Sequence, residues 1–241
     1  AASLLILAYG FITFMHQDKS SLFIIGSIAL IASSIFWWRD VVSESEGGKF
    51  HNKVVQIGLR YGMILFIASE VMFFSAWFWA FFDVAFYPGE NSQELIGRQE
   101  ALGGVFPPED IELIPHFGIP LLNTFILLAS GGTVTWAHHA LRENDRKNFL
   151  IFLFLTILLG LIFTGFQGYE YVHATFSIDE GIYPSTFYMA TGFHGAHVII
   201  GTIFLIVCFI RGAKGHFKPE KHLGFEFAAW YWHFVDVVWL F

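Results

Sequence analysis

Glu70 occupies the most unusual chemical position in this sequence, because it is an acidic residue inside a long apolar segment. It follows Arg60 by ten residues, which is about 15 Å along a helix. In a membrane this depth is near the centre of the hydrocarbon, where a carboxyl group is expected to be protonated, paired, or turned toward protein or water. Neighbours on its helical face, including Phe66, Phe73 and Phe74, are apolar, which favours a neutral acid. Two interpretations remain open: a proton-linked carboxyl group, and a structural acid that hydrogen-bonds a neighbouring helix.

Two pairs of histidines have spacings that are compatible with metal binding. His194 and His197 share a helical face at i, i+3, and His138 and His139 end another apolar segment. Membrane di-iron oxygenases use several boxes of paired and spaced histidines, so such an enzyme is one alternative. Those boxes lie in polar inner loops, whereas His194 and His197 lie in an apolar segment. We therefore predict no metal ligand in this chain.

His233 and Asp236 are a further polar pair, in the last apolar segment. Their i, i+3 spacing lets the imidazole hydrogen-bond the carboxylate across about one helical turn. A proton relay is the alternative, but no continuous series of titratable residues joins Asp236 to Glu70 in the sequence. We predict a structural polar cluster, whose members are His194, His197, His233 and Asp236.

The composition indicates that lipid is the main solvent. Hydrophobic residues make up 55% of the chain and charged residues 14%, against about 45–50% and about 25% in soluble domains. The single cysteine, Cys208, excludes a disulfide framework within the chain. The sequence also lacks a phosphate-binding loop, a Gly-rich dinucleotide turn, a nucleophile elbow and a basic nucleic-acid stripe. Catalysis by this chain alone and nucleic-acid binding are therefore not predicted.

The apolar segments predict an all-α integral membrane protein with seven transmembrane helices. The segments are 1–15, 21–38, 57–85, 118–139, 149–171, 186–211 and 225–241. Helices satisfy their own backbone hydrogen bonds in lipid, and none of the segments alternates polar and apolar residues as a barrel strand would. The first and last segments are short for a membrane span, so we interpret both ends of the chain as truncated.

The positions of Lys and Arg predict how the segments are oriented. If the seven segments cross the membrane alternately, 11 of the 13 Lys and Arg residues fall on one side, and only Lys19 and Arg98 fall on the other. Basic residues favour the cytoplasmic or matrix side. The chain is therefore expected to begin inside and end outside, with the long acidic connection at 83–117 on the outer side.

Seven motifs carry a resemblance to a known family. They are WWRDV at 37–41, GLRYGMILF at 58–66, SEV at 69–71, PLLNT at 120–124, TWAHH at 135–139, ATGFHGAHVIIG at 190–201 and AWYWHFVDVVW at 229–239. Together they resemble the haem-copper oxidase subunit III family, in its cytochrome c oxidase branch. The motifs extend from one end of the chain to the other, and runs of this length are highly specific.

The resemblance implies a fold and a set of partners. A helix pair at about 1–38 and a five-helix group at about 57–241 would surround a lipid-filled cleft within one membrane domain, 1–241. Haem a and copper would be held by partner chains, oxidase subunits 1 and 2, and this chain would have no cofactor except bound phospholipids. It would be a non-catalytic subunit that stabilises the catalytic core and supports proton uptake and oxygen access. Cytochrome c would dock mainly on another subunit.

The resemblance also implies roles for particular residues. Glu70 matches the carbodiimide-reactive glutamate of the family. Tryptophan beside basic residues at the membrane interface suits lipid head groups, and ordinary interfacial anchoring is the alternative interpretation. The residues expected to bind head groups are Trp38, Arg39, His51, Arg60, Arg211, Lys214 and His216.

Two further alternatives concern the class of protein. The third subunit of a quinol oxidase usually lacks the first helix pair, so the hairpin before Arg60 favours the cytochrome c branch. A proton channel or transporter built around Glu70 would be expected to have broken helices or repeats, and the sequence has neither. The length of the acidic outer connection resembles bacterial members, so we expect a bacterial inner membrane, with the mitochondrial inner membrane as the alternative.

Overall fold

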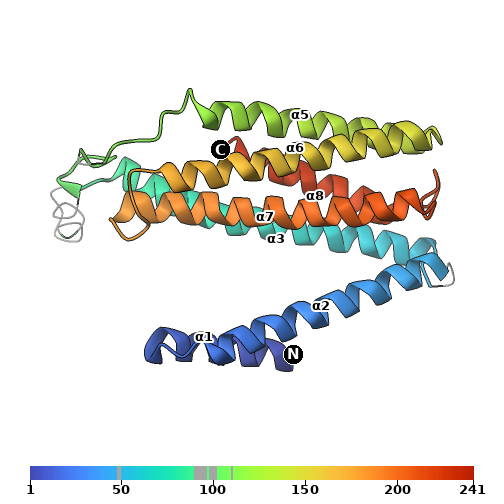
Figure 1. The fold of residues 1–241 in the computed structure, drawn as a ribbon, viewed down its shortest axis with the longest axis horizontal. Coiled ribbons are helices and arrows are strands. Elements are labelled where there is room, and N and C mark those ends of the chain that lie inside the picture. The colour runs from blue at the N-terminus through green and yellow to red at the C-terminus, as the bar shows by residue number, and fades with distance from the viewer. Residues whose placement is uncertain (48–49, 90–96, 98–101, 110) are drawn as a thin grey trace. The chain divides into compact units, whose positions relative to one another are not determined.

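The computed structural model describes residues 1–47, 50–89, 97, 102–109 and 111–241. Much of the predicted acidic outer connection, together with Lys49 and Arg98, lies outside these residues. In the described part of the chain there are seven helices: α1 (Ala2–Gln17), α2 (Ser21–Gly47), α3 (Lys53–Phe86), α5 (Ile119–Arg142), α6 (Arg146–His173), α7 (Ile182–Ala213) and α8 (Leu223–Trp239). The prediction of an all-helical chain is confirmed (Figure 1).

Five of these helices are long and apolar enough to cross a membrane: α2, α3, α5, α6 and α7. The other two are shorter, with 16 residues in α1 and 17 in α8, whereas a span needs about 20 residues. Five of the seven predicted spans are thus supported by length and composition. A spanning role for α1 and α8 stays a prediction.

Several helices continue past the apolar segments that predicted them. Helix α2 runs to Gly47 although its apolar segment ends at 38, and α7 begins at Ile182 although its segment begins at 186. Charged residues such as Arg and Glu have helix propensities close to that of Leu, so an established helix can continue through a polar stretch that contains them. Hydropathy therefore locates the part of a helix that suits lipid, and local turn and cap chemistry determines where the helix ends.

The chain divides into two compact units, Ala1–Leu59 and Arg60–Phe241. In the first unit, α1 and α2 form a hairpin whose backbones approach closely at two glycines. A Cβ atom on Gly26 would lie 2.5 Å from the backbone of Leu7, and one on Gly10 would lie 2.5 Å from the backbone of Leu22. Small residues allow such close helix contact where lipid surrounds the protein. The hairpin therefore depends on glycine at these positions.

In the second unit, α5, α6, α7 and α8 form a closed set of neighbours (Figure 1). Helices α5 and α6, α6 and α7, α7 and α8, and α8 and α5 are all in contact. Two short connections, α5 to α6 and α7 to α8, lie at one end of this set, where the Arg146 guanidinium donates to the Ala213 carbonyl oxygen. The part of α3 from Arg60 onward joins this group through long side chains, including an ion pair and several aromatic contacts.

Trp232 lies at the centre of this second unit and is fully buried. Its indole Nε1–H donates to the Ser130 hydroxyl oxygen of α5 at 2.9 Å. A Cβ atom on Gly160 of α6 would lie 2.7 Å from the ring, and one on Gly201 of α7 would lie 2.9 Å from it. One side chain of α8 thus contacts three other helices, and two of those contacts require glycine.

Candidate functional site

The side chain of Glu70, from α3, meets His197 of α7. Glu70 Oε2 lies 2.8 Å from His197 Nε2. His197 Nδ1 in turn lies 2.6 Å from the carbonyl oxygen of Phe193, one turn earlier in the same helix. Only 21% of the Glu70 side chain and 13% of the His197 side chain are exposed. The acidic residue is therefore paired, and its partner is 127 residues away in the sequence.

The hydrogen bonds of His197 limit the protonation states of the pair. A carbonyl oxygen only accepts hydrogen bonds, so Nδ1 of His197 carries a proton and donates it to Phe193. Nε2 then either accepts a hydrogen bond from a neutral Glu70 carboxyl group or, as part of an imidazolium, donates one to a Glu70 carboxylate. Both arrangements hold one shared proton and have no net charge. The pair therefore avoids the free-energy cost of a lone charge at membrane depth.

Aromatic rings surround this pair. The centroid of the His197 ring lies 4.9 Å from that of Phe74, 6.1 Å from that of Phe73 and 6.3 Å from that of Tyr231. These rings come from two helices, α3 and α8. A hydrogen bond is electrostatically stronger in such low-dielectric surroundings than in water. The rings thus hold the proton-sharing pair in a fixed, apolar setting.

His194 lies one turn before His197 but has different partners. Its Nε2–H donates to the carbonyl oxygen of Val235 at 3.0 Å, and 3% of the residue is exposed. Its ring packs against Trp239 and Phe163. The two histidines that share a helical face therefore serve two separate contacts.

The pair at 138 and 139 also separates. His138 Nε2 lies 3.2 Å from Nε2 of His222, whereas His139 lines a groove formed by residues of α5 and α8. Within the described residues, no group of three or more His, Cys, Asp or Glu side chains is arranged to hold a metal ion.

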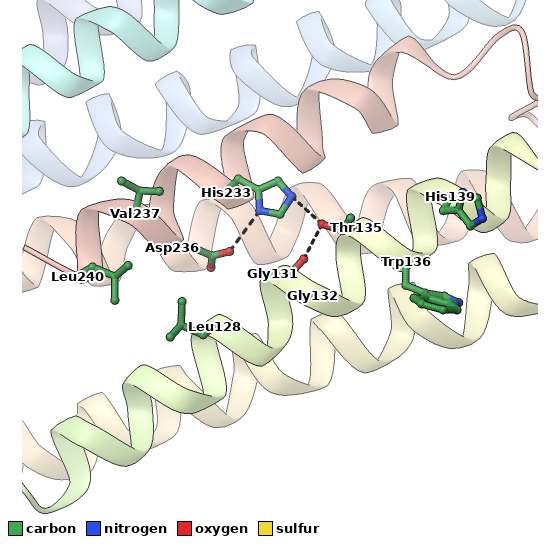
Figure 2. Close-up of a pocket in the computed structure, with 10 residues that line it drawn as sticks. All are labelled: Leu128, Gly131, Gly132, Thr135, Trp136, His139, His233, Asp236, Val237 and Leu240. Carbon is green, nitrogen blue, oxygen red and sulfur yellow. Dashed lines mark hydrogen bonds and ion pairs between the residues drawn. The ribbon is translucent and has the colours of Figure 1, made fainter.

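His233 and Asp236 lie in the groove to which His139 contributes, between α5 and α8 (Figure 2). His233 Nε2 is 3.1 Å from the Thr135 hydroxyl oxygen, and His233 Nδ1 is 3.6 Å from Asp236 Oδ2. The groove has a volume of about 660 Å³. The members of the predicted structural cluster thus occupy three places: the Glu70 contact, the Val235 contact and this groove.

The whole sequence matches a known family model. The model for cytochrome c oxidase subunit III covers residues 1–241. The chain belongs to the cytochrome c oxidase subunit III family. Its relatives named cytochrome c oxidase subunit 3 include one from Arabidopsis thaliana, 53% identical over 96% of this chain and 84% of the relative. Those from Equus asinus and Ornithorhynchus anatinus are 51% and 52% identical over 100% of this chain and 88% of each relative.

Membership in this family confirms the resemblance drawn from the motifs and places the chain in a membrane oxidoreductase complex. The relatives carry the name of the cytochrome c branch, which decides between that branch and the quinol oxidases. The match over residues 1–241 likewise decides against the alternative of a membrane di-iron enzyme.

The residues predicted to bind lipid head groups occur in both units. Trp38, Arg39 and His51 belong to the first unit, where Arg39 pairs with the adjacent Asp40 at 3.2 Å. In the second unit, Arg211 lies over the ring of Phe217. Lys214 follows the end of α7, and the His216 backbone N–H donates to the Arg211 carbonyl oxygen.

Arg60 has a partner that the sequence interpretation missed. Its guanidinium donates two hydrogen bonds, each 2.9 Å long, to the two carboxylate oxygens of Glu226 in α8. Such bidentate geometry is the strongest form of this contact. A signal was available: Glu226 is the second residue of the apolar segment at 225–241 and Arg60 the fourth of the segment at 57–85, so alternate threading places both near the inner surface. Charge and depth together could have identified the pair.

Proposed function

We propose that this chain is the non-catalytic supporting subunit of a cytochrome c oxidase, and that the Glu70–His197 pair is its proton-linked site. The single observation that carries the proposal is the 2.8 Å contact between a carboxyl group and an imidazole inside an aromatic enclosure. In this role the chain docks on oxidase subunits 1 and 2, which hold haem a and copper. It stabilises the catalytic subunit during turnover and supports proton uptake and oxygen access.

The pair is suited to holding a proton because a carboxyl group and an imidazole have three possible charge states between them. With one shared proton it is neutral overall. A second proton gives a neutral acid beside an imidazolium, and loss of the proton gives a carboxylate beside a neutral imidazole. Either change alters the net charge of the pair by one unit in apolar surroundings. The free energy of either change therefore depends on the electrostatic potential around the pair.

Phospholipids are the other ligands of the proposed function. Head groups would meet Trp38, Arg39, His51, Arg60, Arg211, Lys214 and His216 at the inner membrane surface. Their acyl chains would fill a cleft between the helix pair at about 1–38 and the group at about 57–241, with α1 and α8 completing seven spans. Cytochrome c would dock mainly on another subunit. The membrane would be a bacterial inner membrane, with the mitochondrial inner membrane as the alternative.

Removal of the chain from purified oxidase tests the supporting role. We expect the depleted complex to retain its haem and copper spectra and to begin reducing oxygen at a normal rate, then to lose activity progressively during turnover. Restoring the chain should restore the lifetime of the activity. Loss of the haem or copper spectra on removal would show that the chain is part of the redox centres and would refute the proposal.

Replacement of Glu70 tests the proton-linked site. Glu70→Gln retains a hydrogen-bonding side chain, so we expect it to assemble while carbodiimide labelling is lost. Infrared spectra should lose the C=O band of a membrane carboxylic acid or the matching carboxylate bands. Glu226→Gln is the matched control, because it removes a carboxyl group from the ion pair with Arg60 and should leave the Glu70 signals unchanged. Failure of Glu70→Gln to assemble would instead indicate a structural hydrogen bond.

A further inference from the structure

Two histidine side chains meet at the end of the second unit where the α5–α6 and α7–α8 connections lie. His138 is one turn from the end of α5, and His222 directly precedes α8. Their Nε2 atoms are 3.2 Å apart. Both residues belong to Arg60–Phe241, and both are half-buried, which leaves the pair within reach of the surface. The pair is separate from the Glu70–His197 contact between α3 and α7.

The contact is a poor hydrogen bond between two imidazoles. His222 Nδ1 lies 3.0 Å from the Lys218 carbonyl oxygen, which accepts a hydrogen bond, so Nδ1 carries a proton and Nε2 of the neutral ring has a free lone pair. His138 Nε2–H is then the donor, at a separation that is long for an N–H group. The ring centroids are 5.2 Å apart, closer than two rings in line with their nitrogens would be. At least one ring is therefore tilted away from the line joining the nitrogens.

The same arrangement suits a metal ion that is bound by both nitrogens. Zn²⁺ lies about 2.0–2.1 Å from a histidine nitrogen in tetrahedral geometry, which separates two such nitrogens by about 3.3–3.4 Å. The observed 3.2 Å is within about 0.2 Å of that separation, the tolerance of a credible site. The ion lies beside the line joining its two ligands, which agrees with tilted rings. A metal-bound histidine usually donates its other N–H to a carbonyl or carboxylate oxygen, as His222 does to Lys218.

The charged residues around the pair leave room for a cation but supply no third ligand. Glu226 is one turn after His222, and both of its carboxylate oxygens accept from Arg60. That ion pair is neutral overall. Arg142 is one turn after His138 and is exposed, so solvent and salt screen its charge. Water therefore completes the coordination, and an ion with two protein ligands, in place of the four of a structural site, exchanges readily.

We propose that His138 and His222 bind a divalent transition-metal ion, such as Zn²⁺ or Ni²⁺, which links α5 to the start of α8. Imidazole nitrogen suits these ions, whereas Mg²⁺ and Ca²⁺ prefer oxygen ligands. The site has two protein ligands, and it is thus smaller than the groups of three that are absent from the described residues. The sequence interpretation predicted no metal ligand because it compared histidines that are close in the sequence, and this pair is 84 residues apart.

Chemical modification of the intact oxidase tests the ligands without any substitution. Diethylpyrocarbonate reacts with an imidazole nitrogen that has a free lone pair, and mass spectrometry identifies the modified residues. Zn²⁺ at ten times its Kd should slow modification of His138 and His222 about tenfold by mass action. His139, the exposed neighbour of His138, should react at an unchanged rate, and Mg²⁺ should protect none of the three. Unchanged rates at His138 and His222 would overturn the proposal, and so would equal protection of His139.

A thermal assay tests whether the ion links the two helices. An ion that binds the folded chain and not the unfolded chain raises the midpoint temperature of unfolding. With Zn²⁺ we expect a rise of several degrees for wild type and for His139→Gln, and no rise for His138→Gln or His222→Gln. The midpoint of each variant without Zn²⁺ separates a loss of folding from a loss of the ion.

The double variant with His138→Gln and His222→Gln should respond to Zn²⁺ no less than either single variant, because each substitution already removes the site. A Zn²⁺-dependent rise in His222→Gln equal to that of wild type would refute the proposal. Glu70→Gln leaves both ligands in place, so failure of the metal site would leave the proton-linked site standing, and the converse also holds.

Discussion

Gly160 in α6 is the position where the smallest change should have a large effect. A Cβ atom there would lie 2.7 Å from Cη2 of Trp232 and 3.0 Å from the Thr202 hydroxyl oxygen. The Trp232 ring cannot easily move away. Its Nε1–H donates to the Ser130 hydroxyl oxygen, and its Cε3 atom already lies 2.9 Å from where a Cβ atom on Gly201 would be. We predict that Gly160→Ala destabilises the second unit.

The expected magnitude follows from a comparison with a second glycine of the same helix. An ordinary carbon contact is about 3.5–4.0 Å, so Gly160→Ala must open the packing by about 1 Å, and such overpacking typically costs about 1–3 kcal/mol. Gly165 has nothing within 4 Å of its Cβ position. Gly165→Ala should therefore gain only the helix preference of alanine, about 0.5–1 kcal/mol. Because that preference is common to both variants, the difference between them isolates the collision with Trp232.

Heat treatment of purified oxidase provides the assay. The fraction of this chain that remains folded is followed by size-exclusion chromatography with a fluorescent tag on the chain. The midpoint temperature should fall by several degrees for Gly160→Ala and should stay equal or rise for Gly165→Ala. Serine at position 160 should behave like alanine, since the Cβ atom is responsible. Equal midpoints for the Gly160→Ala and Gly165→Ala variants would refute the packing argument.

Two further predictions use the same assay. The Asn148 backbone N–H and side-chain amide hold the pKa of the Asp145 carboxyl group, which caps α6, below its ordinary value. Its stabilisation is therefore present above the unfolded-state pKa of about 3.9 and lost as the pH falls through the lower folded-state pKa. The midpoint difference between wild type and Asp145→Ala should shrink below about pH 4, and a difference that is constant with pH would contradict this assignment. For the Arg60–Glu226 ion pair, a double-mutant cycle with Arg60→Gln and Glu226→Gln should give a coupling free energy of about 1 kcal/mol. The value is small because the Arg60 side chain is 41% exposed and solvent screens the pair. Additive effects of the two substitutions would show that the contact contributes nothing.

The sequence alone determined the elements and the family. Apolar segments predict the helices because lipid requires each backbone segment to satisfy its own hydrogen bonds, and all seven predicted segments contain a helix. The boundaries were less accurate, as at Gly47 of α2, because hydropathy reports the lipid-facing part of a helix and not its caps. The motif resemblance was sufficient to give the family, which the full-length match confirmed.

Only the tertiary structure decided which polar side chains meet. The sequence identified Glu70 as a buried acid and His197 as a polar residue of an apolar helix, but it assigned them to different groups. Their contact depends on the rotation of α3 and α7 about their axes, and local sequence pattern does not fix this rotation when a helix is apolar on nearly every face. The same applies to Trp232, whose importance comes from Gly160 and Gly201 on two other helices. In lipid, close packing and polar pairing select the helix contacts, and both require positions that exist only after the helices have assembled.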